Sequence, residues 1–171
     1  MWEQAKRLVK HALAPRWQHY LSEEAMQRIT AATSAAEVGH SGEIRVCIEA
    51  RLPRSYLLRR APLPAITRQR AISQFSKLRV WDTEHNNGVL IYLLLSERRI
   101  ELVADRGIDA RVAAGTWQRI VQSLGQALRQ DDYEQGLLQA VAAVSTQLQT
   151  HFATADSQPN PDELPNRPDA R

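Results

Sequence analysis

The spacing of apolar residues divides this chain into helices and strands. Apolar residues recur three or four positions apart, as on one face of a helix, in five segments: 2–13, 22–38, 65–79, 117–128 and 131–148. Apolar and polar residues alternate in 42–51, which predicts a strand. Residues 88–96 are almost continuously apolar, which predicts a central strand covered on both faces.

The order of these segments predicts a mixed sheet. The helix at 65–79 lies between strands 42–51 and 88–96, and a right-handed crossover of this kind joins parallel strands. The short turn "SERR" then leads into 99–104, which we expect to be an antiparallel neighbour. The predicted fold class is therefore α/β, a small mixed β-sheet flanked by helices in an α/β/α sandwich.

The chain divides into three predicted parts. Residues 1–20 contain an N-terminal amphipathic helix that ends near Pro15, and residues 21–153 form the α/β domain. Residues 154–171 are rich in proline and polar residues, which predicts a flexible tail, extended or disordered.

The N-terminal helix allows two interpretations. Its apolar side chains share one face, and basic side chains lie on or near the other: Lys6, Arg7, Lys10 and His11. Such a helix can lie on an anionic membrane surface through residues 1–13. Alternatively, Trp2, Val9 and Leu13 pack on the domain.

Composition narrows the class of protein. The chain is 43% hydrophobic and 24% charged, which is typical of a soluble globular protein. Its longest apolar run, 89–95, is far shorter than the roughly 20 residues of a membrane-spanning helix. No signal-peptide pattern is visible, so we expect a cytoplasmic protein. The alternative is a protein bound peripherally to the inner membrane. Phosphate-loop and dinucleotide motifs are absent, so neither a nucleotide nor a redox cofactor is predicted.

Positive charge is concentrated in one segment, although the net charge is only +3. Between residues 51 and 80 there is no acid. A basic segment suits an anionic partner, or it is simply a solvated face. Nucleic acid is not a predicted partner, because no helix-turn-helix, zinc-finger or RNA-stacking signature accompanies the charge. The predicted anion or partner face consists of Arg51, Arg54, Arg59, Arg60, Arg68, Arg70, Lys77 and Arg79.

Oxygen-bearing side chains gather in the loops around the stretch "DTEHNNG". If strands 42–51 and 88–96 are parallel and 99–104 is antiparallel, these loops meet at one edge of the sheet. Carboxylate and amide oxygens suit Ca²⁺ or Mg²⁺. The alternative is that Asn, Asp and Gly are present only because turns favour them. The predicted metal ligands are Glu43, Asp82, Asn86, Asn87, Asp105 and Asp109.

Direct catalysis has weaker support in the sequence. Ser41, His40 and Asp105 have the residue types of a hydrolase triad, but no G-x-S-x-G nucleophile elbow accompanies them. His85 suits a general acid, a metal ligand or an ordinary solvated loop residue. Cys47, the only cysteine, excludes an intrachain disulfide and lies mid-strand, where a small thiol packs.

Three segments of the chain together resemble a TPM domain. They are "GEIRVCIEA", the run from "RAISQFSKLRV" to "ELVADRGID", and the tryptophan of "AAGTW", and the similarity extends over roughly 20–153. The ending "PNPDELPN" also resembles that of the short stand-alone bacterial members. The motif positions are Gly42–Glu43, Thr83, Asn87–Leu90, Asp105, Gly107–Ile108 and Trp117.

The resemblance implies an α/β sandwich with a divalent-cation site at the acidic loops. It also implies acid phosphatase activity, which is attributed to plant members. Many members have an acid before Asn-Gly, where this chain has the neutral Asn86, and losing a carboxylate weakens cation binding. The function we predict is a binding or accessory domain that uses this edge to engage a protein partner. The alternative is a metal-assisted phosphatase with Asp82, Asp105 and Glu43 as ligands.

Overall fold

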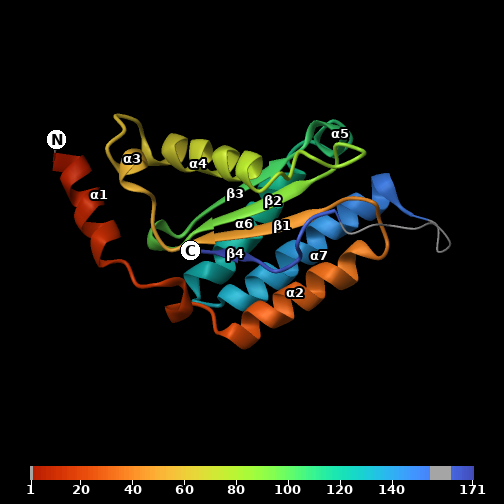
Figure 1. Ribbon diagram of the computed structural model, residues 1–171, viewed down its shortest axis with the longest axis horizontal. Coiled ribbons are helices and arrows are strands. Elements are labelled where there is room, and N and C mark those ends of the chain that lie inside the picture. Colours follow the sequence, from red (N-terminus) through yellow and green to blue (C-terminus); the bar gives the residue numbers. More distant parts are fainter. Residues whose placement is uncertain (1, 155–162) are drawn as a thin grey trace.

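The computed structural model describes residues 2–154 and 163–171, and Figure 1 shows its arrangement of helices around a central sheet. In chain order its elements are α1 (Trp2–Leu13), the 3-10 turn η1 (Trp17–His19), α2 (Glu23–Glu37), β1 (Ile44–Glu49), α3 (Arg54–Leu57), α4 (Leu63–Lys77), β2 (Val89–Leu94), η2 (Leu95–Glu97), β3 (Arg99–Ala104), α5 (Arg106–Asp109), α6 (Thr116–Arg129), α7 (Tyr133–Phe152) and β4 (Asp169–Ala170).

The sheet is mixed, as the order of the segments predicts. Its strands lie in the order β3-β2-β1-β4. β1 and β2 are parallel with Ile44 opposite Val89, and β2 and β3 are antiparallel with Val89 opposite Ala104. The predicted fold class, a small mixed β-sheet flanked by helices, is confirmed. None of the helices in the described part of the chain is long and apolar enough to span a membrane.

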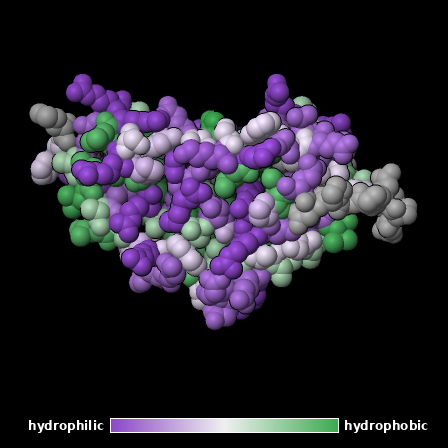
Figure 2. Space-filling view, in the orientation of Figure 1, coloured by the Kyte–Doolittle hydropathy of each residue, from purple (hydrophilic) through white to green (hydrophobic). Residues whose placement is uncertain are grey.

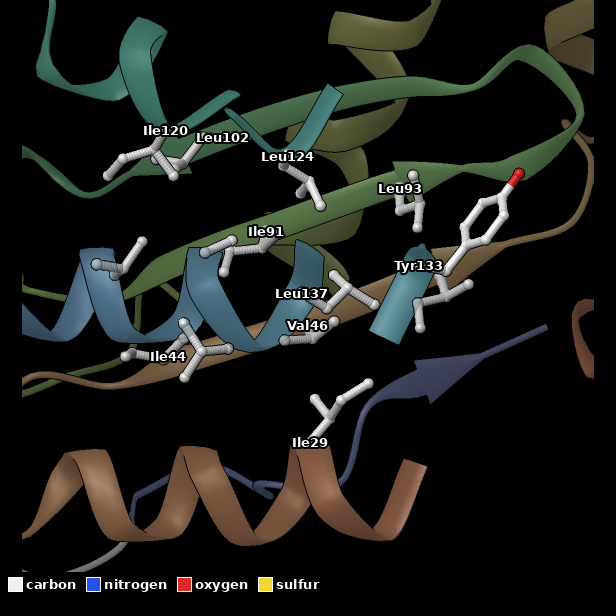
Figure 3. Close-up of a cluster of buried hydrophobic side chains, with 14 of the residues drawn as sticks. Ile29, Ile44, Val46, Ile91, Leu93, Leu102, Ile120, Leu124, Tyr133 and Leu137 are labelled. Carbon is white, nitrogen blue, oxygen red and sulfur yellow. The ribbon is translucent and has the colours of Figure 1, made fainter. Parts of the chain in front are cut away.

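One face of the sheet is covered by α2, α6 and α7. Figure 3 shows Ile29 of α2 and Leu137 of α7 directed toward Val46 and Ile91 of the sheet. The other face carries a second apolar cluster, in which Ile66 of α4 packs with side chains of β1 and β2. Every residue of β1 and β2 is buried as a result. The predicted two-sided cover of the central strand is present, and β1 is covered in the same way.

The last nine residues depart from the predicted disorder of the tail. Arg171 donates its main-chain N–H to the oxygen of Ile48 at 3.0 Å and accepts the N–H of Ala50 at 2.8 Å. β4 thereby extends the sheet beside β1, and Leu164 is buried in the second apolar cluster. Polar composition argues against an independent core, but strand pairing uses main-chain groups and needs few apolar side chains. Residues 155–162 lie outside the described part of the chain.

The tail also accepts hydrogen bonds from a buried cation. Arg45 is a buried residue of β1, and its Nη1 donates to the carbonyl oxygens of Pro165 and Arg167, the latter at 2.7 Å. A buried guanidinium without acceptors would carry a large desolvation penalty. The tail therefore lowers the cost of placing an arginine in β1.

Helix α1 lies against the domain through a buried histidine. His11 accepts the N–H of Leu52 on Nδ1 at 3.0 Å, so its Nε2–H faces Glu97 Oε1 at 3.0 Å. These contacts fix the helix to the segment after β1 and to η2. The packing of Trp2, Val9 and Leu13 on the domain, one of the two interpretations of this helix, is wrong, because all three side chains are exposed.

Replacing Leu164 with alanine tests whether the tail stabilises the domain. We expect Leu164→Ala to lower the free energy of unfolding by about 2–3 kcal/mol, because it removes buried methyl groups and leaves a cavity. Urea unfolding measures this change. Pro165→Ala is the control, since Pro165 is exposed and the variant keeps its main-chain acceptor for Arg45. Equal stability of the two variants would contradict a packed tail.

Replacing His11 with alanine tests how α1 is held. The change leaves the N–H of Leu52 and the carboxylate of Glu97 without their histidine partner, so we expect faster amide exchange throughout residues 2–13. Exchange in β2 should stay slow. Lys10→Ala is the control, because it removes the largely exposed partner of the same carboxylate. Unchanged exchange in His11→Ala would show that α1 is held by other contacts.

Candidate functional site at the loop edge of the sheet

Three loops meet at one edge of the sheet, as the predicted topology requires. Strand pairing continues beyond the strands: Val89 N donates to Glu43 O at 2.8 Å, and Asp105 N donates to Gly88 O at 2.9 Å. We call residues 40–43, 82–88 and 105–109 the loop edge. In Figure 1 it lies where α5 adjoins the loop before β2.

Two glycines allow the loops to approach main chain to main chain. A Cβ atom at Gly88 would overlap the carbonyl oxygen of Val80, and one at Gly107 would overlap the carbonyl oxygens of His85 and Asn86. Asn86 has φ of 52°, the left-handed conformation that asparagine tolerates better than other side chains. Asn86 N donates to Thr83 O at 3.2 Å, so Thr83–Asn86 is a turn, and this is compatible with both interpretations of the stretch.

Asn87 and Asp105 each have one side-chain oxygen that finds no hydrogen-bond partner within the described residues. Asn87 is 0% exposed and Asp105 is 8% exposed. Asn87 donates its Nδ2 to Ser41 Oγ at 3.2 Å, and Asp105 Oδ1 caps α5 by accepting Arg106 N at 2.7 Å. Asn87 Oδ1 and Asp105 Oδ2 are buried with no hydrogen-bond partner in that part of the chain. A buried acceptor without a partner costs about 1–3 kcal/mol.

The other predicted ligands have different surroundings. Glu43 is buried, and its Oε1 accepts the N–H of Glu163 from the tail at 3.1 Å. Asp82 forms an ion pair with Arg79 at the surface, and the exposed Asp109 accepts Trp117 Nε1 at 2.9 Å.

Asn86 is exposed. In the described ranges, no three His, Cys, Asp or Glu residues are grouped so that they could hold a metal ion. Any cation at this edge would therefore depend on amide or main-chain oxygens and water as well as carboxylate.

The Ser41–His40–Asp105 triad is not formed. His40 is buried, with Nδ1 2.9 Å from Gly42 O and Nε2 3.2 Å from Ser145 Oγ. A carbonyl can only accept, so Nδ1 carries the proton and Nε2 accepts from Ser145. Burial lowers the pKa of His40 and favours this neutral form. The histidine joins the loop edge to α7 and has no substrate-facing nitrogen.

Two contacts at this edge were not predicted. Glu37, near the end of α2, accepts the N–H of Ile44 at 2.9 Å, and Ser145 of α7 reaches His40. Neither residue stands in a motif, and only the packing of two helices against the sheet brings them here. His85 is exposed in its loop, and burial raises the pKa of the Cys47 thiol, which packs in the second apolar cluster as predicted.

The eight basic residues predicted as an anion or partner face have different surroundings, and one of them is buried. Arg70 is buried, so it belongs to no face. Arg68 donates to Leu102 O at the edge of β3, Arg79 pairs with Asp82, and Arg59 stacks on Tyr56 with its guanidinium 3.8 Å from the ring centre. The remaining four are exposed: Arg51, Arg54, Arg60 and Lys77.

Arg70 takes part in a buried polar network that the sequence does not reveal. It forms a bidentate ion pair with Glu49 of β1. The same carboxylate accepts Gln74 Nε2 at 2.7 Å and the hydroxyl of Tyr92 at 2.6 Å. Burial, together with the neighbouring Glu49 carboxylate, raises the pKa of Tyr92, which stays protonated. All four side chains are buried, so the network fixes α4 on the sheet.

The buried His40 predicts acid sensitivity. Its lowered pKa means that the unfolded chain binds more protons below the ordinary histidine pKa of about 6.5. Its contribution to stability is therefore present above that value and is lost as the pH falls below it. We expect His40→Asn, which can still donate to Gly42 O, to lose less stability than wild type between about pH 7 and pH 5.

Urea unfolding at several pH values measures this difference. His85→Asn removes an exposed histidine from the neighbouring loop and should keep the pH dependence of wild type. If His40→Asn and wild type had parallel profiles, protonation of His40 would not contribute to acid unfolding.

Solved structures support the architecture independently. The NMR structure of BA42 protein from the psychrophilic bacterium Bizionia argentinensis matches with a TM-score of 0.72 and 27% identity, covering 87% of this chain and 94% of that chain. The solution NMR structure of the N-terminal domain of a P. gingivalis protein matches with a TM-score of 0.59 and 22% identity, covering 83% and 94%. The second similarity shows the fold alone.

No significant match was found among curated proteins. The family model of the TPM domain matches residues 17–147, which include β1, β2, β3 and the whole loop edge, while α1 and β4 lie outside the match. The predicted resemblance is confirmed, and the chain belongs to the TPM domain family.

Proposed function

We propose that this TPM domain is a binding module that holds a Ca²⁺ or Mg²⁺ ion at the loop edge. The ion would order the loops that a protein partner contacts. The observation that carries the proposal is the pair of buried, unsatisfied oxygens, Asn87 Oδ1 and Asp105 Oδ2, in main-chain segments that pair with each other. Both are hard oxygen donors, the ligand type that these two ions prefer.

The surroundings of the loop edge favour a weak site. Calcium affinity rises with the number of carboxylate ligands and with rigidity. Among the predicted carboxylates, Asp105 offers a buried oxygen without a partner in the described residues, whereas Glu43 already accepts the N–H of Glu163 from the tail. Dissociation constants of about 10⁻⁴–10⁻³ M are therefore expected, and water and main-chain carbonyls would complete the coordination.

Metal-assisted phosphatase activity at the same edge has less support from the geometry. Of its three predicted ligands, Asp82 is ion-paired at the surface and Glu43 accepts a main-chain N–H. Phosphoryl chemistry also needs an activated nucleophile and cationic groups around the phosphate. Ser41 Oγ is engaged with Asn87, and Arg79, just before the loop edge, pairs with Asp82. Arg106 of α5 is the exposed arginine within the loop edge, and among the described residues no activated nucleophile accompanies it. Binding without turnover is the function we favour.

An amide NMR titration of metal-free protein with Ca²⁺ and then Mg²⁺ tests the proposal. We expect saturable shifts in residues 40–43, 82–88 and 105–109 of wild type. Asp105→Asn should weaken binding about tenfold or more, because it removes the charge of the ligand. Asparagine caps helices as well as aspartate does, so α5 should remain intact. Asp82→Asn is the control and should bind almost as wild type does, since Asp82 is exposed.

Two outcomes would change the conclusion. Amides that do not move at millimolar Ca²⁺ would leave the loop edge as a set of turns. Ion-dependent hydrolysis of a phosphate ester that disappears in Asp105→Asn would favour the enzyme instead of the binding module.

A further inference from the structure

Helix α1 is attached to the domain by its polar side. Gln4 donates its Nε2 to Leu58 O at 3.0 Å, and Arg7 donates its Nη1 to Ala61 O at 3.2 Å. The buried His11 completes this side through Leu52 and Glu97. A surface helix of a globular protein normally does the opposite and turns its apolar stripe toward the core.

The apolar side of α1 consequently faces outward. Trp2, Val9 and Leu13 share this face, seven and four positions apart, and are 73%, 58% and 78% exposed. Figure 2 shows hydrophobic surface gathered at the end of the molecule where α1 lies. Single exposed apolar residues are common, but a contiguous group marks an interaction surface.

The accessible charge beside this apolar face is positive among the side chains that the structure describes. Lys6 lies on the same face with its Nζ 5.3 Å from the centre of the Trp2 ring, and Lys10 is largely exposed next to it. Glu97, the acid that Lys10 contacts, is almost completely buried.

A crevice adjoins the other flank of the helix. Its volume is about 420 Å³, and it lies between α1 and the segment that follows β1. Arg51 and Arg54, both exposed, line this crevice together with the apolar side chains of Leu8, Ala12, Leu52 and Leu57. Cationic groups are thus present on both flanks of the apolar face, and apolar surface continues between them.

We propose that α1 is a peripheral anchor that lies flat on an anionic lipid bilayer. Trp2, Val9 and Leu13 enter the region between headgroups and acyl chains, and the lysines on the same side meet lipid phosphates. Interfacial helices combine an aromatic and aliphatic face with basic residues in this way. The polar side of such a helix usually faces water, whereas here the domain itself occupies that side.

Charge favours a bilayer over a second copy of this chain as the occupant. Two copies that met through this face would bring Lys6 and Lys10 of one copy toward those of the other, and like charges repel. An anionic bilayer presents the opposite charge over its whole surface. Each basic residue near that surface contributes about 1 kcal/mol to binding. The proposal does not depend on the cation site at the loop edge.

Co-sedimentation of the full chain with lipid vesicles tests the anchor. One set of vesicles contains phosphatidylcholine alone, and the other contains phosphatidylcholine mixed with phosphatidylglycerol. The test variant combines Trp2→Gln, Val9→Gln and Leu13→Gln, because glutamine keeps a high helix propensity. The matched control combines Val38→Gln, Ile72→Gln and Trp81→Gln, which removes similar exposed apolar side chains elsewhere.

We expect wild type and the control to sediment with the anionic vesicles and only weakly with the neutral ones. The α1 variant should lose about tenfold or more of its binding. Added salt should weaken binding by wild type, because salt screens charge attraction beyond about 8 Å at physiological ionic strength. Amide exchange in residues 2–13 of the α1 variant should match that of wild type, which would show that the helix stays folded.

Three results would overturn the proposal. Wild type could fail to sediment with either kind of vesicle. The α1 variant could sediment as wild type does. Finally, wild type could form a concentration-dependent dimer that the α1 variant does not form, without binding vesicles, and α1 would then be an interface between protein chains.

Discussion

Complete burial of β1 and β2 is the constraint on which the rest of this domain depends. Every residue of both strands is buried, so each face of the sheet needs its own cover. Helices α2, α6 and α7 supply the larger cover, and α4 together with the tail supplies the smaller one. Removal of either cover would expose apolar strand surface to water, which costs about 25 cal/mol of free energy for each Å² exposed.

The cover formed by α4 and the tail contains buried polar groups, because β1 directs the polar side chains of Arg45 and Glu49 toward it. Glu49 would be costly to bury alone, and Arg70, Gln74 and Tyr92 surround its carboxylate. Arg45 lies on the same strand, and its Nη1 donates to main-chain oxygens of the tail. Apolar contacts are not directional, so an apolar cover could shift along the strand with little loss of stability. The hydrogen bonds of Glu49 and Arg45 are directional, and they fix the positions of α4 and the tail along β1.

Much of this architecture could be predicted from the sequence, and what escaped prediction has identifiable physical reasons. The parallel β1–β2 pair and the β2–β3 hairpin follow from apolar periodicity and the short turn, because the core selects these patterns. The register of β4 could not be predicted, since it depends on main-chain bonds of Arg171 that no side-chain pattern encodes. The orientation of α1 could not be decided from the sequence for a related reason, because contacts of one buried residue, His11, outweigh the apolar stripe of the helix.

The candidate site shows a different limit. Six oxygen-bearing residues could be assigned to the loop edge, but sequence position cannot show which of them already have partners. Asp82 meets Arg79 three positions earlier, and Asp109 meets the indole of Trp117 eight positions later. Asn87 and Asp105 differ from these only in burial, which the tertiary structure alone determines. Asn and Asp occur both as turn residues and as cation ligands, so the residue type alone does not distinguish the two roles.

The two proposed sites lie at opposite ends of the molecule, so binding at one site leaves the other accessible. Figure 1 places α1 at one end and α5 with the loop edge at the other, with the strands of the sheet running between them. Each six-residue strand spans about 20 Å, more than twice the screening length of about 8 Å at physiological ionic strength. Charge at the anchor therefore exerts little direct influence on an ion at the loop edge. A bilayer bound at α1 would leave the loop edge directed away from the lipid, where a soluble partner can reach it.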